Sequence, residues 1–87
     1  MKINKYNKQK NISGEQIRKL RKENKITQKD LSEKVRLEGI NLTAKEISKI
    51  ETNKRLVQDF ELCAIAKVLD VTTDSLLTNF KNYIDKI

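Results

Sequence analysis

One short pattern recurs five times along this chain and constrains its fold more than any other feature. An apolar residue precedes a polar residue that can cap a helix, and a second apolar residue stands four positions after the cap. In a helix, this spacing lets the two apolar side chains pack together across the first turn as a hydrophobic staple. The five pairs are Ile12 with Ile17, Ile26 with Leu31, Leu42 with Ile47, Val57 with Leu62, and Val71 with Leu76. The chain contains no proline, so the helix boundaries must be read from these caps. Five such starts predict five short helices.

The cap residues predict where each helix begins. They are Ser13, Thr27, Thr43, Thr72 and, as a weaker cap, Gln58 or Asp59. Gln16 stands three residues after Ser13, which predicts a capping box, and Glu46 has the same spacing from Thr43. Asp30 lies in the first turn after Thr27, where the positive end of the helix dipole favours a carboxylate.

Apolar residues inside these segments recur at helical spacing and form the expected core. They are Ile17, Leu20, Leu31, Val35, Ile47, Ile50, Leu62, Ile65, Ala66 and Leu69, with Ser32 as a small contact residue. Gly39 predicts that the second helix ends at about Glu38, because Val35 and Ile40 then form the hydrophobic pair of a Schellman motif. Asn53 and Asp70 also tolerate a left-handed backbone at helix ends. The sequence therefore predicts an all-α, compact bundle of five short helices.

Positive charge is concentrated in the first part of the chain. Residues 1–55 contain 16 Lys/Arg and 7 Asp/Glu, a net charge of +9, whereas residues 56–87 contain 3 and 5, a net charge of −2. A polyanionic partner and a solvated lysine-rich surface both account for this asymmetry. Among the basic residues, we expect Arg18, Arg21 and Lys22 to be exposed and to act in solubility rather than in binding.

Composition argues against several classes of function. The mean hydropathy of −0.69 and the lack of a long apolar stretch predict a soluble cytoplasmic protein without a membrane span or secretory leader. No histidine is present and no serine or carboxylate pair stands in an evident catalytic arrangement, so we expect no enzymatic activity. The one cysteine, Cys63, lies in an apolar run and is expected to be buried. A disulfide framework, a metal site and a cofactor are therefore not expected.

Two segments carry a specific resemblance. They are TQKDLS at residues 27–32 and TAKEISKIE at 43–51, and the second is followed by NKR at 53–55 and IAKVLDV at 65–71. Together these segments resemble the helix-turn-helix of the Cro/CI-like (XRE-type) family of phage and bacterial repressors. The resemblance covers residues 12–77 and implies a lambda-repressor-like DNA-binding fold with a central helix-turn-helix. The chain departs from the family pattern at Arg36, where a glycine is usual, and residues 37–42 lengthen the connection. We expect an extra turn of helix and a loop there.

The third predicted helix is the one that would enter the major groove. With Ile47 and Ile50 facing the core, helical geometry places its polar side chains on the opposite face. The residues available for base contacts are Thr43, Ala44, Lys45, Ser48 and Lys49. Lysines can donate to guanine, serine can pair with several base edges, and methyl groups can meet a thymine methyl. The expected phosphate contacts, in part implied by the resemblance, are Thr27, Gln28, Thr52, Asn53, Lys54 and Arg55.

The ends of the chain predict two further segments. Residues 1–11 form a basic, flexible tail with too little apolar content to pack, residues 12–78 form the DNA-binding domain, and residues 79–87 form a helical extension. Apolar residues recur at helical spacing towards the C-terminus, at Leu77, Phe80, Ile84 and Ile87. They can fold back onto the core or pair with a second subunit.

The sequence thus predicts a sequence-specific regulator of transcription, in the manner of a repressor, whose partner is an operator in double-stranded DNA. A second copy of the chain is a further partner where the C-terminal apolar residues pair rather than fold back. An antitoxin-like or other protein-binding helix-turn-helix module is the alternative, with a protein partner in place of the operator. A third interpretation is a nucleic-acid binder without sequence preference, which would show a steep salt dependence on every duplex.

Overall fold

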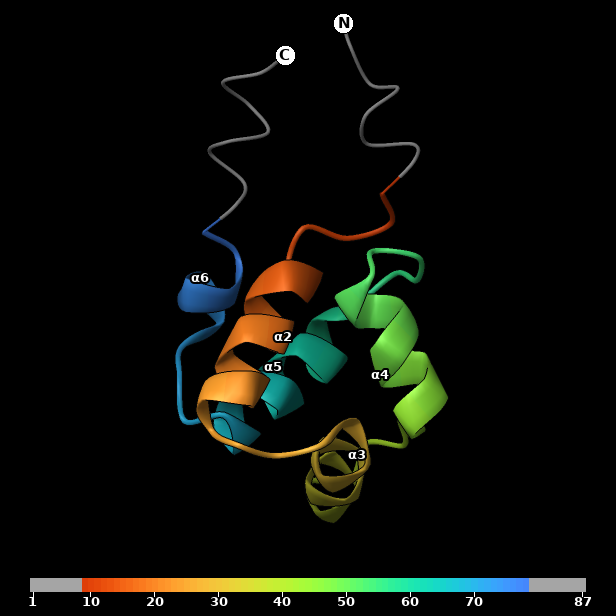
Figure 1. The fold of residues 1–87 in the computed structure, drawn as a ribbon, viewed down its shortest axis with the longest axis vertical. Coiled ribbons are helices and arrows are strands. Elements are labelled where there is room, and N and C mark those ends of the chain that lie inside the picture. The colour runs from red at the N-terminus through yellow and green to blue at the C-terminus, as the bar shows by residue number, and fades with distance from the viewer. Residues whose placement is uncertain (1–8, 79–87) are drawn as a thin grey trace, which may run out of the picture.

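The computed structural model describes residues 9–78, and within them all regular secondary structure is helical (Figure 1). The helices are α2 (Gly14–Glu23), α3 (Gln28–Leu37), α4 (Ala44–Glu51), α5 (Asp59–Val68) and the short α6 (Thr73–Leu76). This confirms the predicted bundle of five short helices. The helix predicted towards the C-terminus beyond residue 78, and most of the basic tail, lie outside the described residues.

The predicted side-chain caps formed at α3, α4 and α6, three of the five helix starts, and at α5 the Gln58 side chain makes no capping bond. At α3 the Thr27 hydroxyl accepts from Asp30 N at 3.0 Å, and the Asp30 carboxylate accepts from Thr27 N at 3.0 Å. Thr43 and Glu46 form the same reciprocal pair at α4, with distances of 3.1 and 2.9 Å. Gln58 N donates to the Glu61 carboxylate at α5, and the Thr72 hydroxyl accepts from Ser75 N at α6. Aspartate therefore completes a capping box at α3, where we expected only a favourable charge.

The prediction that Ser13 caps the first helix is wrong. Its backbone is already helical, with φ −93° and ψ −15°, and its side chain makes no capping bond. A capping side chain needs an extended backbone to reach the amides of the first turn. Asn11 takes this part instead, because its side-chain oxygen accepts from Gly14 N at 2.8 Å.

The end of α3 confirms the predicted Schellman motif. Gly39 has φ +90°, its N–H donates to Arg36 O at 2.9 Å, and Ile40 N–H donates to Val35 O at 3.3 Å. Asn53 and Asp70 have φ of 63° and 58°, as expected, and Lys25 adopts φ 59°. The chain then needs residues 38–43 to reach α4, which is the lengthened connection that the sequence predicted.

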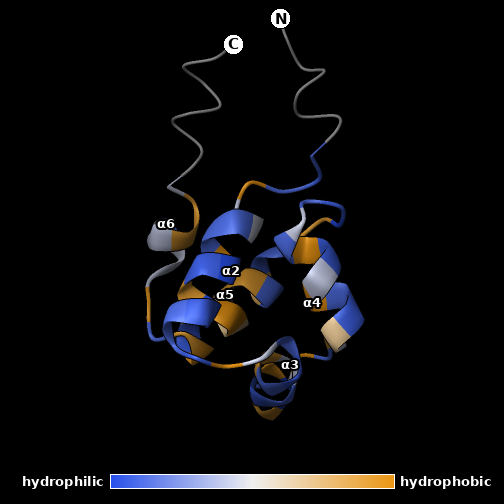
Figure 2. Cartoon of the chain, viewed as in Figure 1, coloured by the Kyte–Doolittle hydropathy of each residue, from blue (hydrophilic) through white to orange (hydrophobic). Residues whose placement is uncertain are grey.

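The core lies where α2, α3, α4 and α5 meet (Figure 2). Its buried side chains are Ile17, Leu31, Val35, Leu42, Ile47, Ile50, Ala64, Ile65, Ala66, Leu69 and Leu76. The predicted core members Leu20 and Leu62 are partly buried and pack against it. No helix within residues 9–78 combines the length and apolarity needed to cross a membrane.

The prediction that Cys63 is buried is wrong, because its side chain is exposed. The run of residues 62–66 is apolar on every side of α5, so this run alone did not define which side faces inwards. At 100° per residue, Cys63 falls on the same face as Phe60 and Lys67, and both of these are exposed as well.

Candidate nucleic-acid interface

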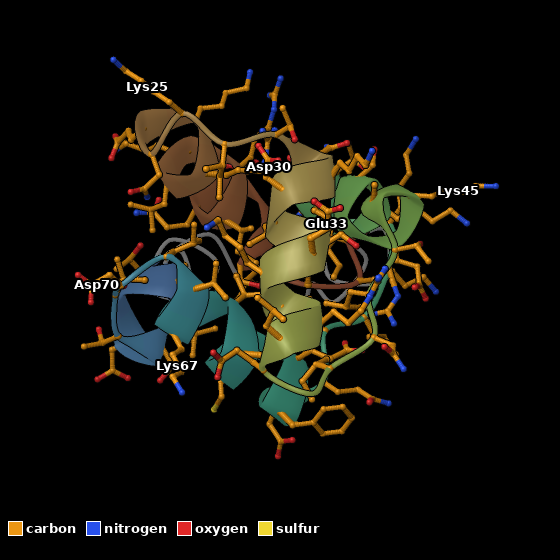
Figure 3. All side chains as sticks on the ribbon, turned by 90° about the horizontal axis from the view of Figure 1, so that it is seen from below. Lys25, Asp30, Glu33, Lys45, Lys67 and Asp70 are labelled. Atoms are coloured by element: carbon orange, nitrogen blue, oxygen red, sulfur yellow. The ribbon has the colours of Figure 1, made fainter. Side chains whose placement is uncertain are left out.

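Helix α4 lies at the edge of the bundle (Figure 1), and its exposed side carries basic residues. Ile47, Ile50 and Glu51 are its buried residues. On the other side Lys45 and Lys49 are exposed, and neither lysine has an ion-pair partner among residues 9–78. Figure 3 shows the Lys45 side chain extending away from the protein body. The helix therefore presents two unpaired positive charges on one side.

The remaining predicted base-reading residues flank these lysines. Ala44 and Ser48 are half-buried and Thr43 is exposed. The Thr43 hydroxyl is engaged in the capping box of α4, which leaves its methyl group as the part free for an apolar contact. All five residues predicted to read bases thus lie on or directly before α4.

A buried charge network holds both ends of the helix-turn-helix to α2. The Glu51 carboxylate accepts from Arg21 Nε at 2.7 Å and Arg21 Nη2 at 3.1 Å. Gln28 Nε2, from the first position of α3, donates to the same carboxylate at 3.1 Å. Arg21 Nη1 also donates to Ile26 O, in the turn before α3, at 2.8 Å. The expectation that Arg21 is exposed is therefore wrong, since Arg21 is 8% exposed and Glu51 is 3% exposed.

This ion pair was not predicted, although the sequence contains a signal for it. Arg21 follows Ile17 by four residues, and Glu51 follows Ile47 by four, so each charge lies on the buried side of its helix. Buried charges of opposite sign on two packed helices are expected to pair, because an unpaired one is very costly.

The loop that leaves α4 contains four of the predicted phosphate contacts. Thr52 donates its hydroxyl back to Ser48 O at 3.0 Å. Asn53 uses its side-chain amide to donate to Asn11 O at 3.0 Å and Asn11 Oδ1 at 2.9 Å. Lys54 is exposed and has no ion-pair partner in the described part of the chain. Arg55, by contrast, is turned towards the protein.

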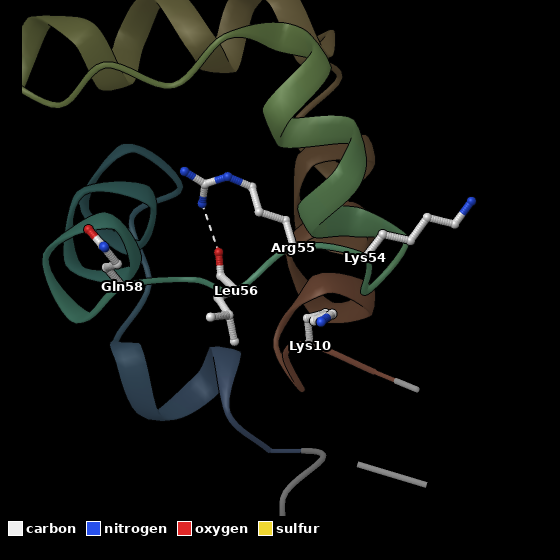
Figure 4. Close-up of a pocket in the computed structure, with 5 residues that line it drawn as sticks. All are labelled: Lys10, Lys54, Arg55, Leu56 and Gln58. Atoms are coloured by element: carbon white, nitrogen blue, oxygen red, sulfur yellow. Dashed lines mark hydrogen bonds between the residues drawn. The ribbon is translucent and has the colours of Figure 1, made fainter. Parts of the chain in front are cut away.

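Two carboxylates hold Arg55. Its guanidinium donates to the two oxygens of Glu61 at 2.9 and 3.1 Å and lies 3.5 Å from a Glu46 oxygen. It also donates to Leu56 O at 2.7 Å, as Figure 4 shows. The hydrogen bonds with Glu61 raise the pKa of Arg55. Burial acts to raise the pKa of Glu61, but hydrogen bonds from Arg55 and from Gln58 N–H outweigh it, so this pKa is lowered.

The start of α3 is the second place where an anion could approach. Thr27 is exposed and Gln28 is half-buried, with its side-chain amide bonded to Glu51. The backbone N–H groups at a helix start favour anions. The described residues contain no group of histidine, cysteine and carboxylate side chains that could hold a metal ion. The groups that the candidate interface offers are therefore lysines, hydroxyls and backbone amides.

A capped helix, a turn, and a second helix with an outward basic face define a helix-turn-helix domain of the DNA-binding class. A protein-family model described as helix-turn-helix matches residues 17–76. The chain belongs to this family, the XRE-type, Cro/CI-like helix-turn-helix proteins. A search of curated proteins and a search of solved structures each found no match. Family membership indicates a DNA-binding regulator of transcription, and this family is not typically enzymatic.

Proposed function

We propose that this chain is a sequence-specific repressor of transcription that inserts α4 into the major groove of its operator. The observation that carries the proposal is the outward face of α4, where Lys45 and Lys49 are exposed and unpaired within residues 9–78. Both can donate to guanine O6 and N7, and Ser48 between them can pair with several base edges. In this proposal the methyl groups of Thr43 and Ala44, at the start of the helix, would meet a thymine methyl.

Phosphate contacts on both sides of α4 would fix its register in the groove. In this proposal they come from Thr27 and Gln28 at the start of α3, and from Lys54 after α4. Thr52, Asn53 and Arg55, also predicted as phosphate contacts, have side-chain donors bonded to the protein. They would support the interface by shaping the loop rather than by direct contact.

Repression would follow from occupancy of a promoter. A module of this size gains specificity by binding as a dimer to two half-sites about 34 Å apart. The predicted pairing surface at the C-terminus lies largely outside the described residues, and Leu77 at its start is half-buried. The protein would act in the cytoplasm, where its DNA target is.

Selection from a randomised duplex library at about 150 mM salt, where electrostatic binding without specificity is weakened, tests the proposal. An enriched palindrome with half-sites one helical turn apart is the expected result. Lys49→Ala should then weaken binding to the selected duplex by about 1–3 kcal/mol, if Lys49 reads a base. A library with no enriched sequence would refute sequence-specific repression, and equal losses on selected and random duplexes would make Lys49 a phosphate contact.

One observation favours the antitoxin-like or other protein-binding module as a second candidate. Leu37, Leu56 and Phe60 are 86%, 66% and 52% exposed, which is unusual for large apolar side chains. A partner protein could cover Leu56 and Phe60, which flank the start of α5. In a reporter strain, this function predicts that Phe60→Ser abolishes regulation while the purified variant still binds duplex DNA with unchanged affinity.

A further inference from the structure

The segment before α2 is fastened to the loop after α4 by two asparagines, Asn11 and Asn53, which we call the asparagine latch. Besides the Asn53 bonds to Asn11 described above, Asn11 Nδ2 donates to Ile50 O at 3.0 Å and to Arg55 O at 2.7 Å. The Asn11 oxygen accepts from Gly14 N as well as from Asn53. Both protons and the oxygen of the Asn11 amide are therefore used.

The latch fixes the position of Lys10. Lys10 N donates to Asn53 O at 2.8 Å, so its backbone is tied to the loop that follows α4. Lys10 and Lys54 line the same surface hollow, of about 380 Å³, together with Arg55, Leu56 and Gln58 (Figure 4). Two residues that are 44 positions apart in the sequence are thus brought to one site.

The hollow carries a net positive charge. Lys10, Lys54 and Arg55 contribute +3, and the neighbouring carboxylates of Glu46 and Glu61 contribute −2, which leaves +1. Glu46 and Glu61 both pair with Arg55, whose guanidinium points away from the side on which Lys54 extends (Figure 4). Lys10 and Lys54 are exposed, and neither has an ion-pair partner among the described residues. An anion at this place would meet two lysines and no free carboxylate from these neighbours.

We propose that Lys10 contacts a phosphate of the DNA backbone together with Lys54, and that Asn11 and Asn53 are the positioning residues that hold it there. This inference rests on the proposed function, because it takes α4 to be the helix in the groove. The loop leaving α4 then runs beside a DNA strand, where lysines bind phosphate without reading sequence. The hydrogen bonds of the latch place the Lys10 backbone before DNA arrives, which reduces the ordering cost of the contact.

Lys10→Ala tests the contact, with Lys67→Ala as its matched control. Lys67 is also exposed, and Figure 3 shows it on the opposite side of the bundle from Lys45. Each variant loses one positive charge. Lys67 also pairs with Glu38 at 2.8 Å, but an exposed pair of this kind contributes little to stability, so a difference in the salt slope of DNA binding comes from position. The full chain is titrated with a random duplex and with the selected duplex, by fluorescence anisotropy, at 50 and 200 mM KCl.

We expect Lys10→Ala to weaken binding to both duplexes by a similar factor. Because one phosphate contact contributes a slope of about −0.9 to log K against log salt, the affinity ratio of wild type to Lys10→Ala should shrink about three- to fourfold between 50 and 200 mM. Lys67→Ala should keep the wild-type slope. If the two variants have the same slope and affinity, the contact is refuted while the proposed function stands. A wild-type chain that binds no duplex overturns both.

Asn53→Gly tests the latch without straining the backbone. Asn53 has φ 63°, a conformation that glycine adopts freely, so this change removes the side-chain amide and little else. In the Asn53→Gly background, Lys10→Ala should weaken DNA binding by a smaller factor than in the wild type. An unchanged factor, in variants that circular dichroism shows to be folded, would rule out a positioning role for Asn53.

Discussion

Gly14→Ala gives the most direct test of how α2 and α4 are packed. A Cβ atom on Gly14 would lie 2.0 Å from Ile50 O and 3.0 Å from Asn11 Oδ1. Because Ile50 O is a backbone atom near the end of α4, it cannot move away without displacing that helix. Helix propensity alone predicts the opposite effect, since alanine is favoured over glycine by about 1 kcal/mol in a helix interior.

The size of the effect follows from these contacts. Overpacking a close contact costs about 1–3 kcal/mol. Separating the two helix ends also disturbs the hydrogen bonds that Asn11 makes with Gly14 N and Ile50 O, each contributing about 1 kcal/mol. After subtracting the gain in propensity, the free energy of unfolding should fall by about 2–4 kcal/mol. A fall of this size is a large part of the total free energy of unfolding of a small domain.

Urea unfolding followed by circular dichroism at 222 nm measures this change. With a slope of about 1 kcal/mol/M for a chain of this size, the midpoint should fall by about 2 M or more. Gly39→Ala is the control, because Gly39 has nothing within 4 Å of its added Cβ but has φ +90°, so it should lose only about 1–2 kcal/mol from the left-handed backbone. A Gly14→Ala protein as stable as the wild type, or more stable, would refute the close contact.

Three further predictions concern charge and exposure. Glu51→Gln leaves Arg21 buried without a countercharge and should lower the free energy of unfolding by about 3–5 kcal/mol in urea unfolding, whereas replacing both residues by methionine should be nearly neutral. Backbone hydrogen bonds from Thr27 and Thr43 lower the pKa values of the Asp30 and Glu46 carboxyls below their ordinary values of 3.8 and 4.5. These two carboxylates therefore stabilise the fold fully at a pH above the ordinary pKa values, and this stabilisation is lost as the pH falls through the lowered pKa values. Unfolding between pH 6 and 2 should show this loss, and an Asp30→Asn/Glu46→Gln variant with an equally steep loss would contradict the assignment. Cys63 in the native protein should react with a thiol reagent as fast as it does in the urea-unfolded protein. A much slower reaction in the native protein would mean that the thiol is covered.

The caps and the helix stop were predictable because they depend on neighbours in the sequence. Thr43 with Glu46, and Gly39 with Val35 and Ile40, are complete within a few residues, so their spacing defines their geometry. Ser13 failed as a cap because its backbone is already helical, and Asn11, two residues earlier, accepts from Gly14 N. Asn11 is also bonded to Ile50 O of α4, which lies about forty positions away in the chain, and a contact of that range is not readable from neighbours in the sequence.

The candidate site was predictable to the extent that it lies on one helix. The outward placement of Lys45 and Lys49 follows from the periodicity of Ile47 and Ile50. Which basic residues remain free could not be predicted in the same way. Arg21 and Arg55 are neutralised by carboxylates that the fold brings to them, and these pairings depend on tertiary structure.

Helix α4 has eight residues, and a helix of two turns does not persist in water without tertiary support. The surface proposed to read DNA therefore exists only while the whole bundle is folded. By mass action, a duplex that binds this surface also shifts the folding equilibrium of every other helix. Chains bound to DNA should then resist proteases longer than free chains do, so that the lifetime of the protein depends on how much of its target is present.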